Sequence, residues 1–275
     1  GGRFKPNTCK ADQKVAIVIA YRDRRKHLLD FLYNILPMLK RQQLDFTIFV
    51  VEQAGTEMFN RGLLMNVGVL ESLKIDNYTC FIFHDVDMYP IHDFNLYKCE
   101  DKPKHMAVAL QKSHFQLLFE GYYGGVSALN KTHVEMTNGF SNAFFGWGGE
   151  DGNHRDRIRA KGLKTVRYPL RYSRYATPGH KRDKTNPTNP ERFQMMQNTK
   201  ARMVYDGLNS VVYNVTDITY LKLYINITIV IDKTAVLKVS ILLNTLKTAY
   251  IHVYFLRFLT CFELHGSLVD SPLSR

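Results

Sequence analysis

The first 90 residues alternate between apolar runs of two kinds. Runs at residues 14–21, 44–51 and 78–83 have the length and composition of buried strands. Between them, residues 27–39 and 59–73 carry apolar side chains at the three-to-four-residue spacing of a helix. This strand–helix–strand–helix–strand order predicts an α/β fold with a mostly parallel, doubly wound sheet and helices on both faces.

The apolar pattern is less regular after residue 100. It predicts a short strand at residues 105–110, a helix at 156–162 and two strands at 210–215 and 221–231. From Asp232 onward the sequence is apolar without clear periodicity, and basic residues divide it into stretches shorter than the ~20 residues that span a bilayer. We expect one domain over residues 1–232 and a tail of unknown role, foreign to the domain and poorly packed, over 233–275.

The strand at 78–83 is followed by two acids, Asp85 and Asp87. Ligands of α/β proteins bind at the carboxyl ends of such strands. An acid-x-acid pair there supplies the hard oxygens that suit a divalent cation holding a diphosphate. The alternative is an ordinary exit from a strand, because Asp is common in turns.

Two glycine-rich segments also have the composition of binding loops. Gly124 and Gly125 follow an aromatic pair and permit a close approach of the backbone, although a tight turn has the same pattern. Trp147, the only tryptophan, stands between glycines just before Glu150 and Asp151. A flat apolar face on a mobile loop suits a sugar ring, and a neighbouring carboxylate suits a general base. The alternative is a helix that begins with two acids in its first turn.

Basic residues are in excess, with a net charge of +12. No nucleic-acid-binding motif accompanies them, so an anionic small molecule is the favoured partner. Arg22, Arg24 and Arg61 follow predicted strands or loops and could reach a nucleotide, although single arginines are usually surface charges. The basic segment 172–192 is long and irregular, as active-site lids often are, and contains His180, a candidate third metal ligand.

The compartment is indicated only weakly. The four cysteines lack zinc-site spacing, and four glycosylation sequons weigh mildly towards the secretory pathway. Because the chain opens without Met or a signal sequence, we expect a fragment whose membrane anchor lies upstream. The sequon asparagines are Asn77, Asn130, Asn214 and Asn226.

Together, these motifs resemble the catalytic domain of the β-1,4-galactosyltransferase family, from Gly1 to about Ile231. The resemblance rests on Gly1-Gly-Arg-Phe4, Ala20-Tyr-Arg-Asp-Arg24, Asn60-Arg61, Asn66-Val-Gly68, Asp85-Val-Asp87, Tyr122-Tyr-Gly-Gly-Val-Ser-Ala128, Gly146-Trp-Gly-Gly-Glu-Asp151, His180-Lys-Arg-Asp-Lys184, Asn189-Pro-Glu-Arg-Phe193 and Asp206-Gly-Leu-Asn-Ser210.

The resemblance implies an inverting, metal-dependent transferase with a GT-A-type fold, anchored as a type II membrane protein in the Golgi and facing its lumen. It would move galactose from UDP-galactose to the 4-hydroxyl of a terminal N-acetylglucosamine on a glycan, with Mn²⁺ as cofactor. Residues 1–100 would form the nucleotide-binding half, and residues 101–232 the acceptor and metal half.

The resemblance also implies roles for single residues. The residues that would contact the nucleotide sugar are Tyr21, Arg22, Arg24, Phe59, Asp85, Val86, Lys112, Tyr122 and Gly125. Asp151 would be the general base, with Glu150 and Trp147 beside it. The acceptor would contact Phe119, Arg192, Phe193 and Met196. The metal would contact Asp87 and His180, with Thr177 in doubt. Cys80 and Cys99 would form a disulfide, and Cys9 a second one with a cysteine upstream.

Three departures from the family pattern bear on function. Thr177 replaces a Met metal ligand, Gly152 replaces a second acceptor-binding Asp, and Phe119 replaces an aromatic residue with a hydroxyl. An N-acetylgalactosaminyltransferase of the same family is the first alternative, but the bulky Tyr122 favours galactose. A non-catalytic sugar-binding relative, suggested by Gly152 and the tail, is the second.

Overall fold

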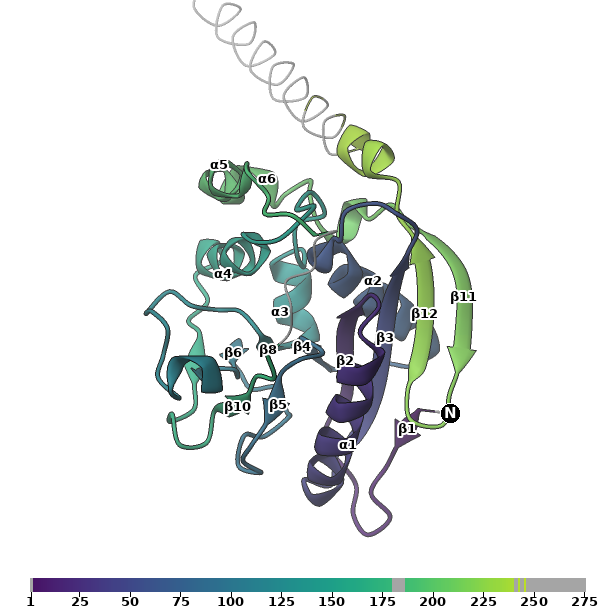
Figure 1. The fold of residues 1–275 in the computed structure, drawn as a ribbon, viewed down its shortest axis with the longest axis vertical. Coiled ribbons are helices and arrows are strands. Elements are labelled where there is room, and N and C mark those ends of the chain that lie inside the picture. Colours follow the sequence, from purple (N-terminus) through teal and green to yellow (C-terminus); the bar gives the residue numbers. More distant parts are fainter. Residues whose placement is uncertain (1, 180–185, 240–241, 243–244, 246–275) are drawn as a thin grey trace, which may run out of the picture.

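A nine-stranded mixed sheet forms the centre of the computed structural model, which describes residues 2–179, 186–239, 242 and 245 (Figure 1). Its strands lie in the order β11 (Asn214–Tyr220), β12 (Ile225–Val230), β3 (Asp45–Ala54), β2 (Lys14–Tyr21), β4 (Cys80–His84), β8 (Val126–Asn130), β6 (Lys104–His105) and β9 (Val166–Arg167), and β1 (Arg3–Phe4) pairs with β3. Strands β12, β3, β2 and β4 are parallel, whereas β8 and β11 run against their neighbours. The predicted mostly parallel α/β sheet is confirmed.

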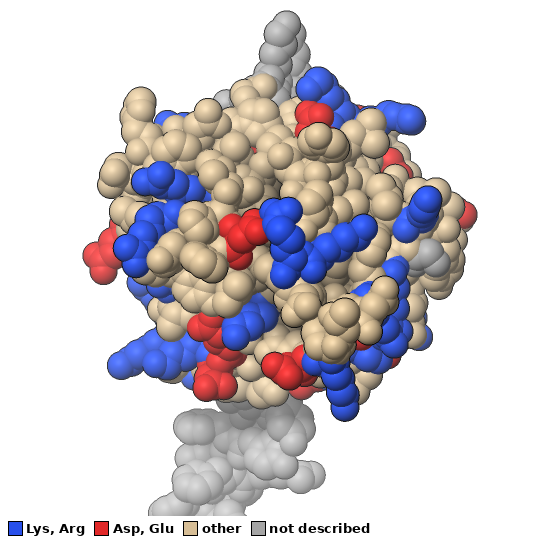
Figure 2. Space-filling view, turned by 90° about the horizontal axis from the view of Figure 1, so that it is seen from below, with Lys and Arg blue, Asp and Glu red and all other residues tan. Residues whose placement is uncertain are grey.

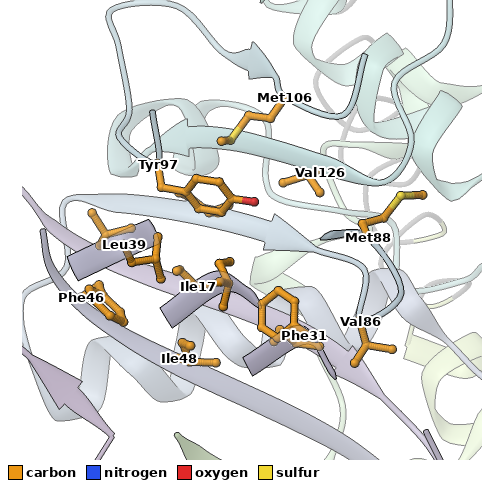
Figure 3. Close-up of a cluster of buried hydrophobic side chains, with 14 of the residues drawn as sticks. Ile17, Phe31, Leu39, Phe46, Ile48, Val86, Met88, Tyr97, Met106 and Val126 are labelled. Carbon is orange, nitrogen blue, oxygen red and sulfur yellow. The ribbon is translucent and has the colours of Figure 1, made fainter. Parts of the chain in front are cut away.

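Two helices cover opposite faces of the parallel strands. Helix α1 (Arg25–Arg41) packs on the face that carries Ile17, and α2 (Arg61–Ile75) packs on the face that carries Val18. Figure 3 shows the first of these two clusters, with Phe31 and Leu39 of α1 against Ile17 and Ile48 of the sheet. The alternation of side chains along a strand therefore builds two cores.

The second half of the chain adds short helices and a small second sheet. The helices are α3 (Lys131–Met136), α4 (Glu150–Ala160), α5 (Arg192–Gln197) and α6 (Thr199–Arg202), with short 3-10 turns η1 (Gln111–Ser113) and η2 (Leu208–Ser210). The small sheet contains β5 (Tyr89–Pro90), β10 (Arg174–Ala176) and β7 (Ala109–Leu110).

Several sequence-based boundaries differ from the structure. The strand predicted at 221–231 begins only at Ile225, because residues 221–224 connect β11 to β12. Residues 105–110 do not form one strand, because β6 and β7 belong to different sheets. The strand predicted at 210–215 begins only at Asn214, since Leu208–Ser210 form a 3-10 turn. The helix predicted at 156–162 begins at Glu150, so the helix N-terminus with acids in its first turn is real.

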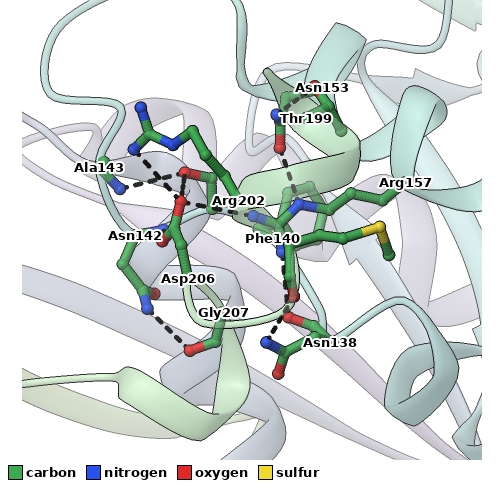
Figure 4. Close-up of polar contacts among 12 residues, drawn as sticks. Asn138, Phe140, Asn142, Ala143, Asn153, Arg157, Thr199, Arg202, Asp206 and Gly207 are labelled. Atoms are coloured by element: carbon green, nitrogen blue, oxygen red, sulfur yellow. Dashed lines mark hydrogen bonds and ion pairs between the residues drawn. The ribbon is translucent and has the colours of Figure 1, made fainter. Parts of the chain in front are cut away.

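A buried ion-pair network fixes the orientation of α4 (Figure 4). Arg157 is fully buried, its Nη2 lies 3.5 Å from Oδ2 of Asp206, and its Nε donates to Asn153 Oδ1 at 2.9 Å. Asp206 also accepts hydrogen bonds from Ser141 and from the backbone N–H of Asn142. Because a buried arginine needs such partners, the network holds the start of α4 against the segment that precedes it.

The beginning of the tail packs on the domain. Residues 233–239 are helical, and the helix is capped by Asp232, whose Oδ1 accepts the N–H of Ala235 at 3.1 Å. Val236 is only 2% exposed and belongs to the same core as Ile229 and Ile231. The expectation that residues after Asp232 pack poorly is therefore wrong for this helix. Among the described residues, no helix combines the length and apolar composition needed to cross a bilayer.

Basic side chains do not form one continuous patch on the face shown in Figure 2. On the face in Figure 2, groups of Lys and Arg are separated by acidic side chains and by uncharged surface. This distribution fits the spread of basic residues along the sequence.

Candidate active site

A cavity of about 240 Å³ lies where β2 and β4 end and α2 and α4 begin. Because these ends meet at one edge of the sheet, residues far apart in sequence line it together. Its lining contains nine residues expected at the site: Arg22, Arg24, Phe59, Asp85, Val86, Asp87, Trp147, Glu150 and Asp151. Ala20, Arg61, Gly146 and Asn186 complete it.

Arg61 stands among three carboxylates in this cavity. Its Nε donates to Asp85 Oδ1 at 2.6 Å, and its Nη1 donates to Asp151 Oδ1 at 2.7 Å. Nη1 also lies 3.9 Å from Glu150 Oε1. Arg61 begins α2 directly after the helix cap Asn60, whose Oδ1 accepts the N–H of Leu63 at 2.9 Å. From the sequence, Arg61 could have been an ordinary surface charge. In the structure its side chain is mostly buried and forms ion pairs with Asp85 and Asp151.

The carboxylates of α4 have an environment that favours protonation. Burial, opposed by Arg61 and reinforced by Glu150 and Asp85, raises the pKa of Asp151 to about 8. Burial also raises the pKa of Glu150, and its Oε2 accepts no hydrogen bond within the described part of the chain. A carboxylate with a pKa near neutrality is suited to taking up a proton.

A chain of buried hydrogen bonds holds the segment that follows β4. His84 Nδ1 lies 2.8 Å from the backbone oxygen of Asp85, and His84 Nε2 lies 2.8 Å from the hydroxyl of Tyr97. That hydroxyl is 3.0 Å from the hydroxyl of Tyr175 in β10. Burial lowers the pKa of His84 to about 4, so the ring is neutral and offers one donor and one acceptor. The backbone of Asp85 is thus hydrogen-bonded to a side chain of the buried core.

Two of the residues that we expect to bind the nucleotide, Arg22 and Phe59, lie against each other beyond the end of β2. The guanidinium of Arg22 lies over the ring of Phe59, 5.2 Å from its centroid, and its Nη1 donates to the backbone oxygen of Glu57 at 2.8 Å. Tyr21, in contrast, is 8% exposed and packs in the core, outside the cavity lining. Lys112 is exposed on η1 and does not line the cavity either.

The tryptophan loop is attached to the segment that follows residue 185. The backbone N–H of Trp147 donates to Pro187 O at 2.8 Å, and the N–H of Asn189 donates to Trp147 O at 3.0 Å. Gly148 and Gly149 have φ values of +101° and +100°, which non-glycine residues rarely adopt. The side chain of Trp147 remains 59% exposed at the edge of the cavity.

Tyr122 and Asp151 converge on Gly124. A Cβ at Gly124 would lie 2.9 Å from Asp151 Oδ2 and 3.1 Å from the hydroxyl of Tyr122. Gly125 has a φ of +86°, and a Cβ there would lie 3.0 Å from Cβ of Ala107. The close approach expected of these glycines is therefore observed, and its partners include the acid of α4.

The residues expected at the acceptor lie beside the cavity rather than in its lining. Arg192, Phe193 and Met196 belong to α5, which packs on the start of α4. A Cβ at Gly152 would lie 2.5 Å from Cε of Met196, so the methionine occupies the space that a larger residue would need. The side chain of Phe119 is 61% exposed, and its ring meets that of Tyr122 edge-on at 5.8 Å.

The expected metal ligands are only partly described. Asp87 lines the cavity, and its carboxylate oxygen suits a divalent cation. The hydroxyl of Thr177 accepts the N–H of Lys112 at 3.3 Å. His180 lies outside the described residues. Within the described part of the chain, no group of three or more His, Cys, Asp or Glu side chains is gathered as a metal site.

The disulfide between Cys80 and Cys99 is confirmed, with a Cα–Cα distance of 5.4 Å. It links the beginning of β4 to the segment before β6. Cys9 is exposed and is not paired with another described cysteine.

Comparisons with known proteins agree with this geometry. Residues 1–100 match the model "N-terminal region of glycosyl transferase group 7", and residues 104–181 match the model "N-terminal domain of galactosyltransferase". The chain is 47% identical to beta-1,4-galactosyltransferase 2 of Mus musculus over 83% of its own length and 62% of that protein. It is 45% identical to human beta-1,4-galactosyltransferase 4 over 83% of its length and 66% of that protein. It thus spans less than two thirds of these relatives.

Solved structures give the same picture. The crystal structure of the catalytic domain of Drosophila beta1,4galactosyltransferase 7 with xylobiose has a TM-score of 0.68, 27% identity, and coverage of 80% of this chain and 94% of that chain. A mutant of that enzyme in complex with manganese, UDP-Gal and xylobiose has a TM-score of 0.67 and 28% identity, over the same shares of both chains. The GT-A fold expected from the sequence is thereby confirmed.

Proposed function

Since the chain belongs to the β-1,4-galactosyltransferase family, we propose that it transfers galactose from UDP-galactose to the 4-hydroxyl of a terminal N-acetylglucosamine, with inversion. The observation that carries the proposal is the cavity in which Arg61 joins Asp85 after β4 to Asp151 of α4. It brings the acid pair suited to a nucleotide sugar next to an acid suited to proton uptake.

Asp151 is proposed as the general base. The acceptor hydroxyl must lose its proton while its oxygen attacks the anomeric carbon, and the Asp151 carboxylate in the cavity lining can take that proton. The acceptor oxygen attacks the face opposite UDP while the bond to UDP breaks, and this single displacement inverts the anomeric centre. Arg61 holds Asp151 in place and partly offsets the effect of burial on its pKa. Glu150, on the same helix turn, is proposed to bind a sugar hydroxyl.

The nucleotide half of the site is proposed to contain Arg22, Arg24, Phe59, Asp85 and Val86, with Tyr21 packed behind them in the core. Arg22 and Phe59 present a stacked pair at the cavity wall, which suits a nucleotide base or ribose. Lys112 is proposed to approach the diphosphate, and Trp147 to cover the donor when its loop closes. Exclusion of water by that loop would protect the donor from hydrolysis.

Mn²⁺ is proposed as the cofactor, held by Asp87 and His180, with the hydroxyl of Thr177 as a weaker candidate. When bound, the ion would act as a Lewis acid that stabilises the charge of the leaving diphosphate. Asp87 is well supported, because its carboxylate lines the cavity and follows a segment fixed by His84.

The acceptor is proposed to lie against Arg192, Phe193, Met196 and Phe119. The exposed rings of Phe193 and Phe119 offer flat apolar faces to a sugar. Gly152 contributes no carboxylate, and Met196 occupies the space above it. We therefore expect acceptor binding to be weaker than in relatives with an acid at this position, with chemistry retained because Asp151 is present.

Galactose is the proposed donor sugar because of Tyr122. Its hydroxyl and the carboxylate of Asp151 both approach Gly124, so a donor sugar held beside Asp151 would have the Tyr122 ring where an N-acetyl group needs space. An N-acetylgalactosaminyltransferase remains the alternative. Gly125, which directly precedes β8, is proposed to contact the same sugar.

We further propose that the protein works in the Golgi lumen. The disulfide between Cys80 and Cys99 is typical of proteins in oxidising compartments and supports this proposal. The sequon asparagines Asn77 and Asn214 are exposed, and so are accessible for glycosylation. In contrast, the side chain of Asn130 caps α3, and that of Asn226 donates to Glu52.

The decisive assay measures UDP release from UDP-galactose in the presence of N-acetylglucosamine and Mn²⁺. The wild type should release UDP, and Asp151→Asn should lose about 10²–10⁴-fold in rate, the usual contribution of a general base. Asp217→Asn, an exposed acid of β11, is the matched control and should retain the wild-type rate.

Other outcomes of the assay identify the alternatives. Faster turnover of UDP-N-acetylgalactosamine would assign the other donor. Equal rates for wild type and Asp151→Asn would refute the base. A folded protein that releases no UDP with either donor would be a non-catalytic relative.

A further inference from the structure

Two arginines hold one turn of the chain by its backbone. The turn comprises residues 120–122 and lies between η1 and β8; we call it the 120–122 turn. Arg155 Nη1 donates to Gly121 O at 2.6 Å. Arg167 Nη2 donates to Glu120 O at 2.9 Å and to Tyr122 O at 2.6 Å. Three consecutive carbonyls thus accept hydrogen bonds from two guanidinium groups.

Both arginines are themselves anchored in regular structure. Arg155 belongs to α4, and its Nε and Nη2 donate to Asp156 Oδ1 at 2.9 and 2.7 Å. Arg167 belongs to β9, and its Nε lies 3.2 Å from Nδ1 of His105 in β6. The turn is therefore tied both to the helix that carries Asp151 and to the edge of the central sheet.

His105 extends the same set of contacts. Its Nε2 lies 3.0 Å from Gly124 O, while its Nδ1 faces Arg167. Since the arginine is always a donor, Nδ1 must accept and Nε2 must carry the hydrogen that goes to Gly124 O. The ring is fully buried, and it packs 5.3 Å from the ring of Tyr122. The carbonyls of residues 120, 121, 122 and 124 are thus all held.

Gly121 is shaped for this arrangement. A Cβ there would lie 2.4 Å from Arg155 Nη1, so any larger residue would push the guanidinium away. Gly121 does not have a positive φ, so an alanine would cost no backbone strain. The absence of a side chain at Gly121 therefore leaves room for the guanidinium of Arg155.

The turn positions two side chains of the proposed sugar site. Phe119 precedes it and Tyr122 ends it, and their rings contact each other edge-on. The Tyr122 hydroxyl and Asp151 Oδ2 both lie about 3 Å from the position of a Cβ at Gly124. A displacement of the turn by about one ångström would therefore change the space between Tyr122 and Asp151, and misplacements of this size are costly at a reacting centre.

We propose that Arg155 and Arg167 are positioning residues that lock the 120–122 turn and thereby set which donor sugar the site accepts. The inference rests on the proposed function, because Tyr122 limits the donor to galactose only if the donor sugar lies beside it. Arginine suits this task, because its planar fork of donors spans neighbouring carbonyls, which the single ammonium of lysine does not. Loosening the turn lets the Tyr122 ring withdraw, and space opens for an N-acetyl group.

The first test compares Gly121→Ala, Arg155→Lys and Arg167→Lys with wild type, with Arg159→Lys, an exposed residue of the same helix, as control. The readout is kcat/KM for UDP-N-acetylgalactosamine divided by kcat/KM for UDP-galactose. We expect the ratio to rise by about tenfold in the three variants, the usual effect of opening a small amount of space in a pocket, and to stay unchanged in the control. Wild-type ratios in all variants would overturn the proposal.

The second test is independent of activity. Hydrogen–deuterium exchange of the amides at residues 119–125 should be faster in Gly121→Ala and Arg167→Lys than in wild type and Arg159→Lys. Gly121→Ala should fold normally, because only the mobile end of Arg155 has to move. If wild type transfers no sugar, the proposed function fails, and exchange still decides whether the turn is locked. Unchanged exchange in both variants would overturn the proposal.

Discussion

The guanidinium of Arg61 donates to Asp151 at 2.7 Å. The two residues are 90 positions apart in the sequence, at the first turns of α2 and α4. The opposite charge of Arg61 lowers the pKa of Asp151, while burial raises it more strongly, to about 8. The pKa of the proposed base is therefore raised mainly by burial and lowered by Arg61, and a substitution of Arg61 removes the second effect.

Arg61→Gln should move the pH dependence of the reaction. Without the positive charge, the pKa of Asp151 rises further, so a smaller fraction of the enzyme has the unprotonated base at pH 7. The acidic limb of kcat/KM against pH should shift to higher pH, and the rate at pH 7 should fall. Arg41→Gln, which removes a surface ion pair with Asp93, is the control and should leave the limb in place. An unmoved limb in Arg61→Gln would show that the charge does not control the base.

Thr177→Met should strengthen Mn²⁺ dependence. A thioether is a softer donor than a hydroxyl and prefers Mn²⁺ over Mg²⁺, so Mn²⁺ should bind more tightly and its advantage should widen. In the wild type we expect Mn²⁺ to remain the better activator through His180, with a smaller preference than in Met-bearing relatives. Activity is titrated against each metal, with Thr177→Val as a control that has neither donor. Identical curves for wild type and Thr177→Met would mean that residue 177 does not face the metal.

Loss of the disulfide should lower stability without changing the reaction. Cys80 and Cys99 are separated by 19 residues, and a bridge closing a loop of this size contributes about 3 kcal/mol. The double variant Cys80→Ala and Cys99→Ala should therefore unfold at lower denaturant concentration while retaining KM for the donor. Cys9→Ala, at an exposed position, should unfold like wild type. A double variant as stable as wild type would remove the structural role assigned to the bridge.

Two truncated chains test whether residues 233–239 belong to the domain. A chain ending at residue 239 keeps Val236 in the core. A chain ending at residue 232 loses that side chain and should be less stable by about 2 kcal/mol, the value of burying one valine. Urea unfolding of both chains measures the difference. Equal stability of the two would restore the original boundary at Asp232.

Local patterns were sufficient for the central elements of the fold. The run at 14–21 is β2 from end to end, and the acids Asp85 and Asp87 follow β4 as expected. These elements could be predicted because the pattern of a buried strand or an amphipathic helix involves only residues a few positions apart. Trp147, Glu150 and Asp151 were likewise recognisable, because glycines beside a tryptophan and two acids form a contiguous motif.

The tertiary structure decided which distant side chains meet. Arg61 was a possible surface charge in the sequence, and only the meeting of α2, β4 and α4 at one edge of the sheet surrounds it with three acids. The same reason separates β6 from β7, whose strand partners lie elsewhere in the chain, and buries Val236 in a tail without periodicity. It also brings Arg155 and Arg167 to the 120–122 turn. Contacts of this kind depend on packing across the whole sheet, so no window of the sequence contains them.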